Sequence, residues 1–299
     1  MTLRLPDHWL WDSWYVADGD HHHAFFLRAS RTLVDPRRRH THAAVGHAVS
    51  RDLRAWTVLP DALLPADAPA WDDLAIWTGS VVRGPNGQWH LFYTGISRAL
   101  GTPVQRIGRA VSDDLITWRR AGTDPVALAD PKWYDTHAGG ASESWRDPWV
   151  FADPSGDGWH MLVTARSNEG DPAGRGVIGH ARSADLAEWS VGPPLSRPAG
   201  FVDLEVPQVV EIDGQVVLVF SCAPWVWSVA APSVLGPFDV DRAIPFAHPS
   251  LYAGRIVTNG DGGWSLLGFR DVEDGEFCGD LIDPIPIDFT PRDGLVART

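Results

Sequence analysis

The chain has 299 residues, a hydrophobic content of 44% and a formal net charge of −13. This length can form one large all-β domain, and the apolar content is ample for a sizeable core. The acidic excess argues against nucleic acid or an anionic membrane as the main partner, because both require basic patches. Since residues 1–8 show no apolar leader and no long apolar run follows, we expect a cytoplasmic protein.

Short apolar strands are predicted along the whole chain. In chain order, the clearest lie at residues 23–27, 89–93, 159–163, 215–219 and 264–268. Turn signals rich in Gly, Asn and Asp precede most of them, and a further apolar strand lies upstream of several. No amphipathic pattern of three helical turns interrupts this order. The sequence therefore predicts an all-β fold.

One turn motif recurs three times. Residues 46–56, 108–118 and 179–189 all read Gly-x-Ala-x-Ser-x-Asp-Leu-x-x-Trp. We interpret each copy as a strand, a Ser/Asp turn and a short outer strand opened by the tryptophan. Together with the upstream strands, the unit recurs five times at a spacing of roughly 45 to 70 residues, which is typical of propeller blades.

We therefore expect a five-bladed β-propeller that forms a single domain over residues 1–299. The stretch 279–287 is expected to complete the last blade or to close the ring. No C-terminal β-sandwich is expected, because the five blades already account for the chain.

Three acidic residues stand at what the repeat predicts to be matching places. Asp12 lies in Trp-Asp-Ser-Trp, Asp147 in Trp-Arg-Asp-Pro and Glu205 in Leu-Glu-Val-Pro. Each is expected to open the innermost strand of its blade, so the fold would bring the three carboxyl groups to one end of a central channel. Because like charges repel, such a cluster indicates a functional site.

Cleavage of a glycosidic bond needs two carboxyl groups in different protonation states. Asp12 is predicted to be the ionised group that attacks or stabilises the anomeric carbon. Glu205 is predicted to be the acid, because its Leu, Val and Pro neighbours would raise its pKa by desolvation. Arg146 is expected to hold Asp147 ionised for binding sugar hydroxyls.

Sixteen tryptophans stand against four tyrosines, and the broad indole face stacks well on sugar rings. Five residues near the acids or on the rim are predicted, with Arg146, to contact a saccharide: Trp11, Trp14, Trp77, Ser80 and Trp225. The two indoles that flank Asp12 are expected to donate hydrogen bonds to it and to exclude water.

These segments resemble glycoside hydrolase families 32 and 68, the fructan-active enzymes with a five-bladed propeller. Residues 11–14 resemble the nucleophile motif of levansucrases, and residues 146–148 match the Arg-Asp-Pro motif of both families. Glu205 lies where these families place the general acid/base, and residues 77–80 are similar to a segment that lines the fructose subsite.

The resemblance implies a retaining reaction on β-fructofuranosides such as sucrose or short fructans. It implies a covalent fructosyl intermediate on Asp12, with Asp147 binding fructose hydroxyls and stabilising the transition state. The Asn-Asp-Pro-Asn-Gly opening of invertases is absent, which favours a transferase-like active site.

Two alternatives stay open. A propeller resembling glycoside hydrolase family 43 would invert, acting on arabinofuranosides or xylosides. Its carboxyl groups would stand about 6.5–9.5 Å apart rather than about 5–5.5 Å. A non-catalytic sugar-binding propeller would keep the tryptophans without needing a perturbed acid.

The remaining polar residues are assigned weaker roles. Cys222 and Cys278 are interpreted as buried thiols. The run at 21–23, three histidines, is not expected to bind metal, because neighbouring residues of a strand point to opposite faces. We therefore expect no metal and no cofactor. The loop before Asp147, with polar residues at 135, 137 and 143, is a candidate for shaping the leaving-group subsite.

Overall fold

A computed structural model describes residues 2–136, 143–260, 262–290 and 294–298 of the chain. These residues form two compact units. Unit 1 comprises Met1–Asp61 and Gln208–Thr299, and unit 2 comprises Ala62–Pro207. Whether the whole chain behaves as one domain stays a prediction.

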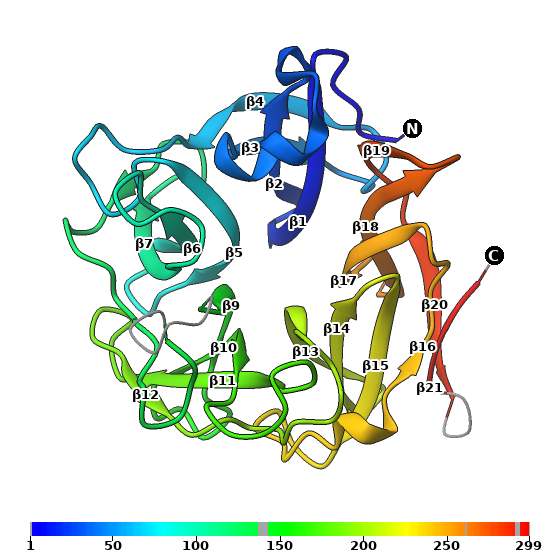
Figure 1. Cartoon of the computed structure of the whole chain (residues 1–299). Helices are drawn as coiled ribbons and strands as arrows, with labels where there is room; N and C mark the ends of the chain where they lie inside the picture. The colour runs from blue at the N-terminus through cyan, green and yellow to red at the C-terminus, as the bar shows by residue number, and fades with distance from the viewer. Residues whose placement is uncertain (1, 137–142, 261, 291–293, 299) are drawn as a thin grey trace. The chain divides into compact units, whose positions relative to one another are not determined.

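The described strands form five antiparallel sheets that follow one another along the chain (Figure 1). The first sheet contains β1 (His8–Asp18), β2 (His21–Ser30), β3 (Ala44–Ser50) and β4 (Thr57–Leu63). The second contains β5 (Ala75–Arg83), β6 (Trp89–Ile96), β7 (Arg106–Ser112) and β8 (Arg119–Arg120). The third contains β9 (Trp145–Ala152), β10 (Trp159–Arg166), β11 (Gly176–Ser183) and β12 (Ser190–Gly192).

The fourth sheet contains β13 (Glu205–Ile212), β14 (Gln215–Cys222), β15 (Trp225–Ala231) and β16 (Ile244–Pro245). The fifth contains β17 (Leu251–Thr258), β18 (Trp264–Glu273), β19 (Glu276–Leu281), β20 (Ile285–Thr290) and β21 (Gly294–Ala297). The stretch 279–287 thus belongs to the last blade, as predicted. The predicted all-β fold with five propeller blades is confirmed.

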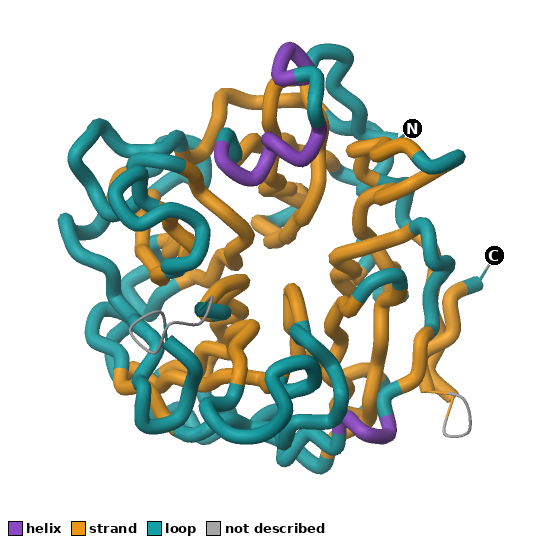
Figure 2. The backbone as a smooth tube through the Cα atoms, viewed as in Figure 1, coloured by secondary structure: helices purple, strands orange, loops and turns teal. Residues whose placement is uncertain are grey.

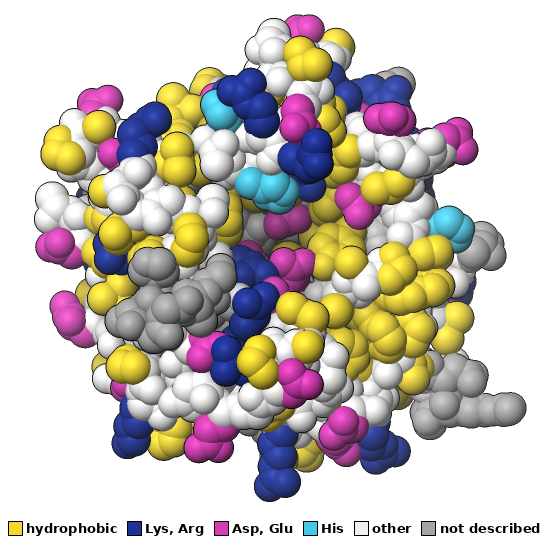
Figure 3. Space-filling model, viewed as in Figure 1, with side chains coloured by type: hydrophobic (Ala, Val, Ile, Leu, Met, Phe, Trp, Pro, Cys, Tyr) yellow, Lys and Arg dark blue, Asp and Glu magenta, His cyan; other side chains and the backbone are white. Residues whose placement is uncertain are grey.

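Helix in the described ranges is limited to short 3₁₀ turns between strands (Figure 2). They are η1 (Arg31–Leu33), η2 (Pro36–Thr41) and η4 (Val240–Arg242). None of the described helices is long and apolar enough to cross a membrane. On the face seen in Figure 3, acidic and basic side chains are interspersed around apolar areas.

The recurring motif folds into the predicted Ser/Asp turn. In its second copy, Asp114 Oδ1 accepts hydrogen bonds from Ser112 Oγ at 2.9 Å and from the backbone N–H groups of Ile116 and Thr117 at 2.8 and 2.7 Å. The leucine that follows the aspartate, Leu115, is buried with φ 63°. Each outer strand begins at the residue after the motif tryptophan. The motif therefore recurs because one local turn closes each of these three blades.

The motif glycine is fixed by a close approach between strands. A Cβ atom on Gly179 of β11 would lie 2.6 Å from Val163 Cγ2 and 2.8 Å from Ala165 Cβ on the neighbouring strand β10. Only glycine leaves room for this contact.

Each unit has an apolar core of its own. In unit 2 the core includes Trp145, Phe92 and Met161, all fully buried. In unit 1 a core cluster includes Val219 and Leu266. The strand that carries Asp147, β9, is therefore anchored by side chains from its own unit.

A β-bulge recurs in the first strand of several blades. Relative to its partner strand, the first strand gains one residue at four corresponding places: Asp12, Thr78, Asp147 and Ala253. Asp12, Asp147 and Ala253 have positive φ angles of 24°, 58° and 49°. Aspartate tolerates this conformation better than most residues, and a bulge re-aims the side chain it carries. The fold thus places two of the three predicted acids on equivalent bulges.

Glu205 does not occupy the place predicted for it. In the fourth blade the residue with the corresponding positive φ, 52°, is Val206. Glu205 therefore lies one residue earlier, at the position that Arg146 holds in the third blade. The prediction of three matching places is correct for Asp12 and Asp147 and wrong by one residue for Glu205. Likewise, only Glu205 begins its strand, because β1 and β9 start upstream of their acids.

Candidate functional site

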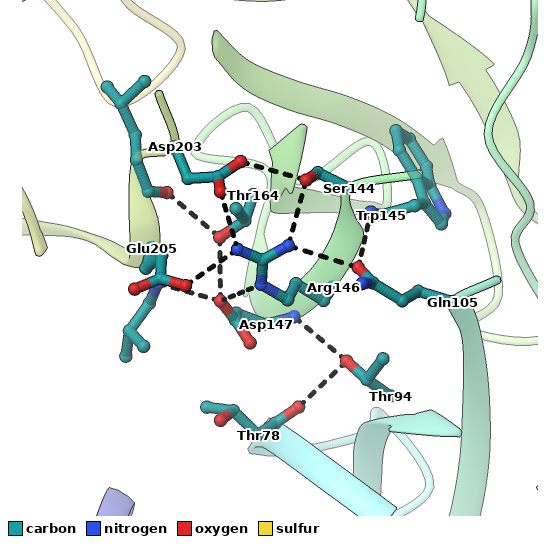
Figure 4. Close-up of polar contacts among 12 residues, drawn as sticks. Thr78, Thr94, Gln105, Ser144, Trp145, Arg146, Asp147, Thr164, Asp203 and Glu205 are labelled. Atoms are coloured by element: carbon teal, nitrogen blue, oxygen red, sulfur yellow. Dashed lines mark hydrogen bonds and ion pairs between the residues drawn. The ribbon is translucent and has the colours of Figure 1, made fainter. Parts of the chain in front are cut away.

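Unit 2 brings two of the predicted acids together around one guanidinium (Figure 4). Arg146 Nη2 donates to Glu205 Oε1 at 2.7 Å, and Arg146 Nε lies 3.6 Å from Asp147 Oδ2. Arg146 and Asp147 come from β9, whereas Glu205 is the first residue of β13. The predicted association of Asp147, Glu205 and Arg146 is therefore present within one unit.

Arg146 is fixed on every side by acceptors. Its Nη1 donates to Ser144 Oγ at 3.0 Å and to Gln105 Oε1 at 3.3 Å, and its Nη2 also lies 3.1 Å from Asp203 Oδ2. Burial lowers the pKa of Arg146, but the three neighbouring carboxylates outweigh burial and raise it further above its usual value. The guanidinium is thus permanently charged and held in one orientation.

Asp147 is 3% exposed and is held by short hydrogen bonds. Its Oδ2 accepts from Thr164 Oγ1 at 2.8 Å and from the backbone N–H of Val206 at 3.1 Å, and its own N–H donates to Thr94 Oγ1 at 3.0 Å. Burial raises the pKa of Asp147 above its usual value; Arg146 opposes this, and Glu205 adds to it. Arg146 thus favours the ionised form of Asp147, although desolvation has the larger effect on its pKa. That Arg146 holds this carboxyl group ionised stays a prediction.

Glu205 lies in a setting that its sequence neighbours did not suggest. Its side chain is 31% exposed, and one carboxyl oxygen accepts the hydrogen bond from Arg146. The prediction that its Leu, Val and Pro neighbours surround this carboxyl group is thus wrong, since Leu204 and Val206 are themselves buried while the carboxyl group is partly exposed and contacts Arg146.

Asp12 belongs to unit 1, so its meeting with Asp147 and Glu205 stays a prediction. Within unit 1 it interacts electrostatically with Arg39, a residue of η2. Arg39 also packs its guanidinium 5.6 Å from the ring centroid of Trp11 and 3.9 Å from that of Phe277. Burial lowers the pKa of Arg39, whereas Asp12 and Asp271 raise it. A cation therefore lies in the electrostatic environment of the predicted nucleophile.

The predicted saccharide contacts divide into two groups. Trp14 is fully buried and stacks on Phe25, and its indole N–H has no hydrogen-bond partner among the described residues. The prediction that it donates to Asp12 is therefore wrong. Ser80 is 1% exposed, and its Oγ accepts from the backbone N–H of Val150 at 3.1 Å, so it links β5 to β9 instead of facing a ligand.

The predicted saccharide contacts of the other aromatic candidates are neither confirmed nor contradicted. Trp11 is 3% exposed and meets His40 edge to face at 6.3 Å between centroids. Trp77 and Trp225 are half-buried, at β5 and at the start of β15. Contact of these three with a saccharide stays a prediction.

The polar loop before β9 has a structural role where it is described. Asp135 forms an ion pair with Arg175, and Glu143 Oε1 accepts from the backbone N–H of Gln105 at 3.4 Å. His137 lies outside the described residues. Cys222 and Cys278 are reduced and half-buried, so the prediction of buried thiols is wrong. Among the described residues, no group of three or more His, Cys, Asp or Glu side chains is placed to bind a metal.

Sequence reasoning missed the residues that hold the cluster. Asp203 pairs with both Arg146 and Arg166, and Ser144 Oγ donates to Asp203 Oδ1 at 2.9 Å. The signal available was spacing, because Ser144 and Arg146, like Asp203 and Glu205, stand two residues apart. Residues at that spacing share a face when the chain is extended.

The arrangement can bind and polarise a polyhydroxylated ligand. A fixed guanidinium and two carboxyl groups in different surroundings offer both donors and acceptors to neighbouring hydroxyl groups. Two carboxyl groups whose environments differ are also the elements of acid–base chemistry on a glycosidic bond.

Comparison with protein families gives a match over most of the chain. The model described as "Glycosyl hydrolases family 32 N-terminal domain" matches residues 14–242. Beta-fructofuranosidase 1 of Zea mays is 32% identical over 154 residues, which are 50% of this chain and 21% of the maize protein. The extracellular sucrase of Zymomonas mobilis is 28% identical over 256 residues, 71% of this chain and 61% of the sucrase. The chain thus spans less than two thirds of either relative.

Solved structures are similar over nearly the whole chain. An inulosucrase from Halalkalicoccus jeotgali bound to kestose superposes with a TM-score of 0.78 at 21% identity, covering 98% of this chain and 87% of that one. A fructan 1-exohydrolase IIa from Cichorium intybus gives a TM-score of 0.77 at 17% identity, covering 99% and 59%. At these identities the similarity shows the fold.

Proposed function

Because the chain belongs to glycosyl hydrolase family 32, we propose that it is a retaining enzyme acting on β-fructofuranosides such as sucrose or short fructans. The observation that carries this proposal is the Arg146-centred cluster in unit 2, where Glu205 Oε1 lies 2.7 Å from Nη2 and Asp147 Oδ2 lies 3.6 Å from Nε of one guanidinium. Relatives named as a sucrase and beta-fructofuranosidases support the choice of substrate.

In the proposed first step, the carboxylate of Asp12 attacks C2 of the fructosyl group. Glu205 gives its proton to the glycosidic oxygen, so the leaving sugar departs as a neutral alcohol. The C2–O bond to the leaving sugar breaks and an ester to Asp12 forms. Asp147, fixed by Thr164 and by Val206 N–H, binds fructose hydroxyls and stabilises the positive charge that develops on the ring.

In the second step Glu205 acts as the base. It takes a proton from water, which attacks C2 and releases fructose, or from the hydroxyl of a second sugar, which gives transfer. If the enzyme is cytoplasmic, as we expect, it meets small imported sugars, which favours short fructosides as substrates.

The proposal is tested by product release from sucrose and 1-kestose by the wild type and three variants. Asp12→Asn and Glu205→Gln are expected to lose at least about 100- to 10,000-fold in kcat, the range for loss of a positioned acid, base or nucleophile. Asp147→Asn is expected to lose a similar factor. Matched controls are Asp18→Asn on β1 and Glu211→Gln on β13, two exposed acids that should keep wild-type rates.

Three other outcomes would redirect the assignment. Release from arabinofuranosides or xylosides with none from fructosides would favour the inverting alternative. Binding of sugars without turnover would favour the non-catalytic propeller. Full activity in Asp12→Asn or Glu205→Gln would remove that residue from its proposed role.

A further inference from the structure

Asp203 completes a chain of alternating charges that ends at Glu205 (Figure 4). Arg146 Nη2 lies 2.7 Å from Glu205 Oε1 and 3.1 Å from Asp203 Oδ2, so two carboxylates share one nitrogen. Asp203 in turn accepts from Arg166 at both oxygens, from Nη2 at 2.7 Å and from Nε at 3.0 Å. The order of charges is Glu205, Arg146, Asp203, Arg166.

Asp203 is built to stay ionised. Its side chain is 15% exposed, and burial raises its pKa. Arg146, Arg166 and the hydrogen bond from Ser144 outweigh burial and hold the pKa of Asp203 below its usual value. The negative charge beside Arg146 is therefore present across the range of pH in which an acid/base at Glu205 would work.

A guanidinium 2.7 Å from a carboxyl group strongly favours the carboxylate form. Glu205 in the proposed reaction must also be protonated, because it gives a proton to the leaving oxygen. A second carboxylate on the same guanidinium nitrogen opposes the effect of Arg146 on Glu205, because like charges repel. None of the roles assigned above to Asp12, Asp147 or Glu205 uses this carboxylate.

We propose that Asp203 is a positioning residue for Glu205: Asp203 shares the guanidinium of Arg146 with Glu205 and so weakens the attraction between Arg146 and the Glu205 carboxylate. The inference rests on the proposed function, in which Glu205 is the general acid/base. Arg166 has the opposite effect on Glu205 to that of Asp203, because it neutralises part of the charge of Asp203.

The first test follows the ionisation of Glu205 without requiring activity. The full chain has only seven glutamates, so ¹³C labelling of glutamate side-chain carboxyl groups gives few signals, and Glu205→Gln assigns the relevant one. In Asp203→Asn the titration midpoint of Glu205 is expected to fall by about one pH unit, a tenfold loss of proton affinity. In Arg166→Gln the midpoint is expected to rise, because the full negative charge of Asp203 then pairs with Arg146 and no longer partly with Arg166. Glu211→Gln is the control and should not move it.

If Asp203 has only a structural role, the two variants will not shift the titration midpoint of Glu205 in opposite directions. An unchanged midpoint in Asp203→Asn, or movement in the same direction in both variants, would overturn the proposal. If Asp203→Asn does not fold, the direction of the shift in Arg166→Gln decides the matter alone.

The second test separates this proposal from the proposed function. With sucrose, the basic limb of the pH profile of kcat/KM should move down in Asp203→Asn and up in Arg166→Gln, with KM little changed. With an aryl fructoside whose leaving group needs no protonation, Asp203→Asn should keep close to the wild-type rate. Inactivity of the wild type on all fructosides would reject the proposed function, and the carboxyl titration would then still judge Asp203.

Discussion

The charge on Asp147 is held at a cost to stability. Its pKa is raised by burial, so the folded chain binds this proton more tightly than the unfolded chain does. The contribution of Asp147 to stability is therefore highest in acid and falls as the pH rises from its unfolded pKa through its folded pKa. A buried charge that lowers stability is common at functional sites, because activity and stability compete there.

Replacing Asp147 by asparagine should therefore stabilise the protein while inactivating it. The amide keeps an acceptor for Thr164 and Val206 but removes the buried charge. We expect Asp147→Asn to be about 1 kcal/mol more stable than the wild type at pH 7. The gain should vanish near pH 3, as measured by urea unfolding at both values.

Asp203→Asn is the matched comparison, and we expect it to change the free energy of unfolding in the opposite direction from Asp147→Asn. The pKa of Asp203 is depressed, so its contribution is present above its unfolded pKa and is lost as the pH falls through its folded pKa. We expect a loss of about 2 kcal/mol at pH 7 that shrinks in acid. Equal destabilisation of both variants at both pH values would contradict this account of the two carboxyl groups.

The residue scale also shows where sequence reasoning ends. Asp147 and Arg146 were predictable, because they are adjacent in a recognisable motif. The environment of Glu205 was not, because the guanidinium that it meets lies 59 residues away in the chain. Trp14 and Ser80 were assigned to the ligand because they flank motif residues, but neighbours in a strand point to opposite faces, and a bulge changes which face.

At the scale of elements, the Ser/Asp turn is the part of the fold that the sequence predicts best, because its interactions are local. Asp114→Ala removes the acceptor of two backbone N–H groups and of Ser112 Oγ, and we expect a loss of about 1 kcal/mol in unfolding free energy. Asp114→Asn keeps one oxygen and should lose less. Wild-type stability in Asp114→Ala would show that the turn forms without this cap.

The first three blades also share a pair of basic residues on their second and third strands. His23 bonds His47 at 2.9 Å in the first blade, and His160 bonds His180 at 2.9 Å in the third. The second blade has His90 in the equivalent place, 5% exposed. Burial, with a smaller contribution from Arg109, lowers the pKa of His90 to about 4.

This histidine should make the protein sensitive to acid. The folded chain favours neutral His90, so its contribution to stability is full above pH 6.5 and is lost as the pH falls from 6.5 to about 4. Over that range we expect the wild type to lose about 2 kcal/mol more than His90→Gln. The control variant His248→Gln, at an exposed position, should show the same pH dependence of stability as the wild type. Parallel pH dependence in wild type and His90→Gln would contradict the assignment.

At the scale of the whole molecule, blade number was predictable and domain behaviour was not. Five blades follow from a pattern that repeats along the chain, whereas cooperativity depends on packing between segments far apart in sequence. We expect residues 1–299 to unfold in one transition, with equal calorimetric and van't Hoff enthalpies. Fructose should raise the midpoint if it binds the folded chain. Two resolved transitions would show that the two compact units unfold separately.

The central claim is that the chain cleaves β-fructofuranosides with retention through an ester to Asp12. The most direct measurement is the configuration of the product formed from sucrose in aqueous methanol, read by NMR, since a methyl fructoside cannot mutarotate. The account predicts methyl β-D-fructofuranoside from the wild type and none from Asp12→Asn. Methyl α-D-fructofuranoside, or unchanged transfer by Asp12→Asn, would contradict it.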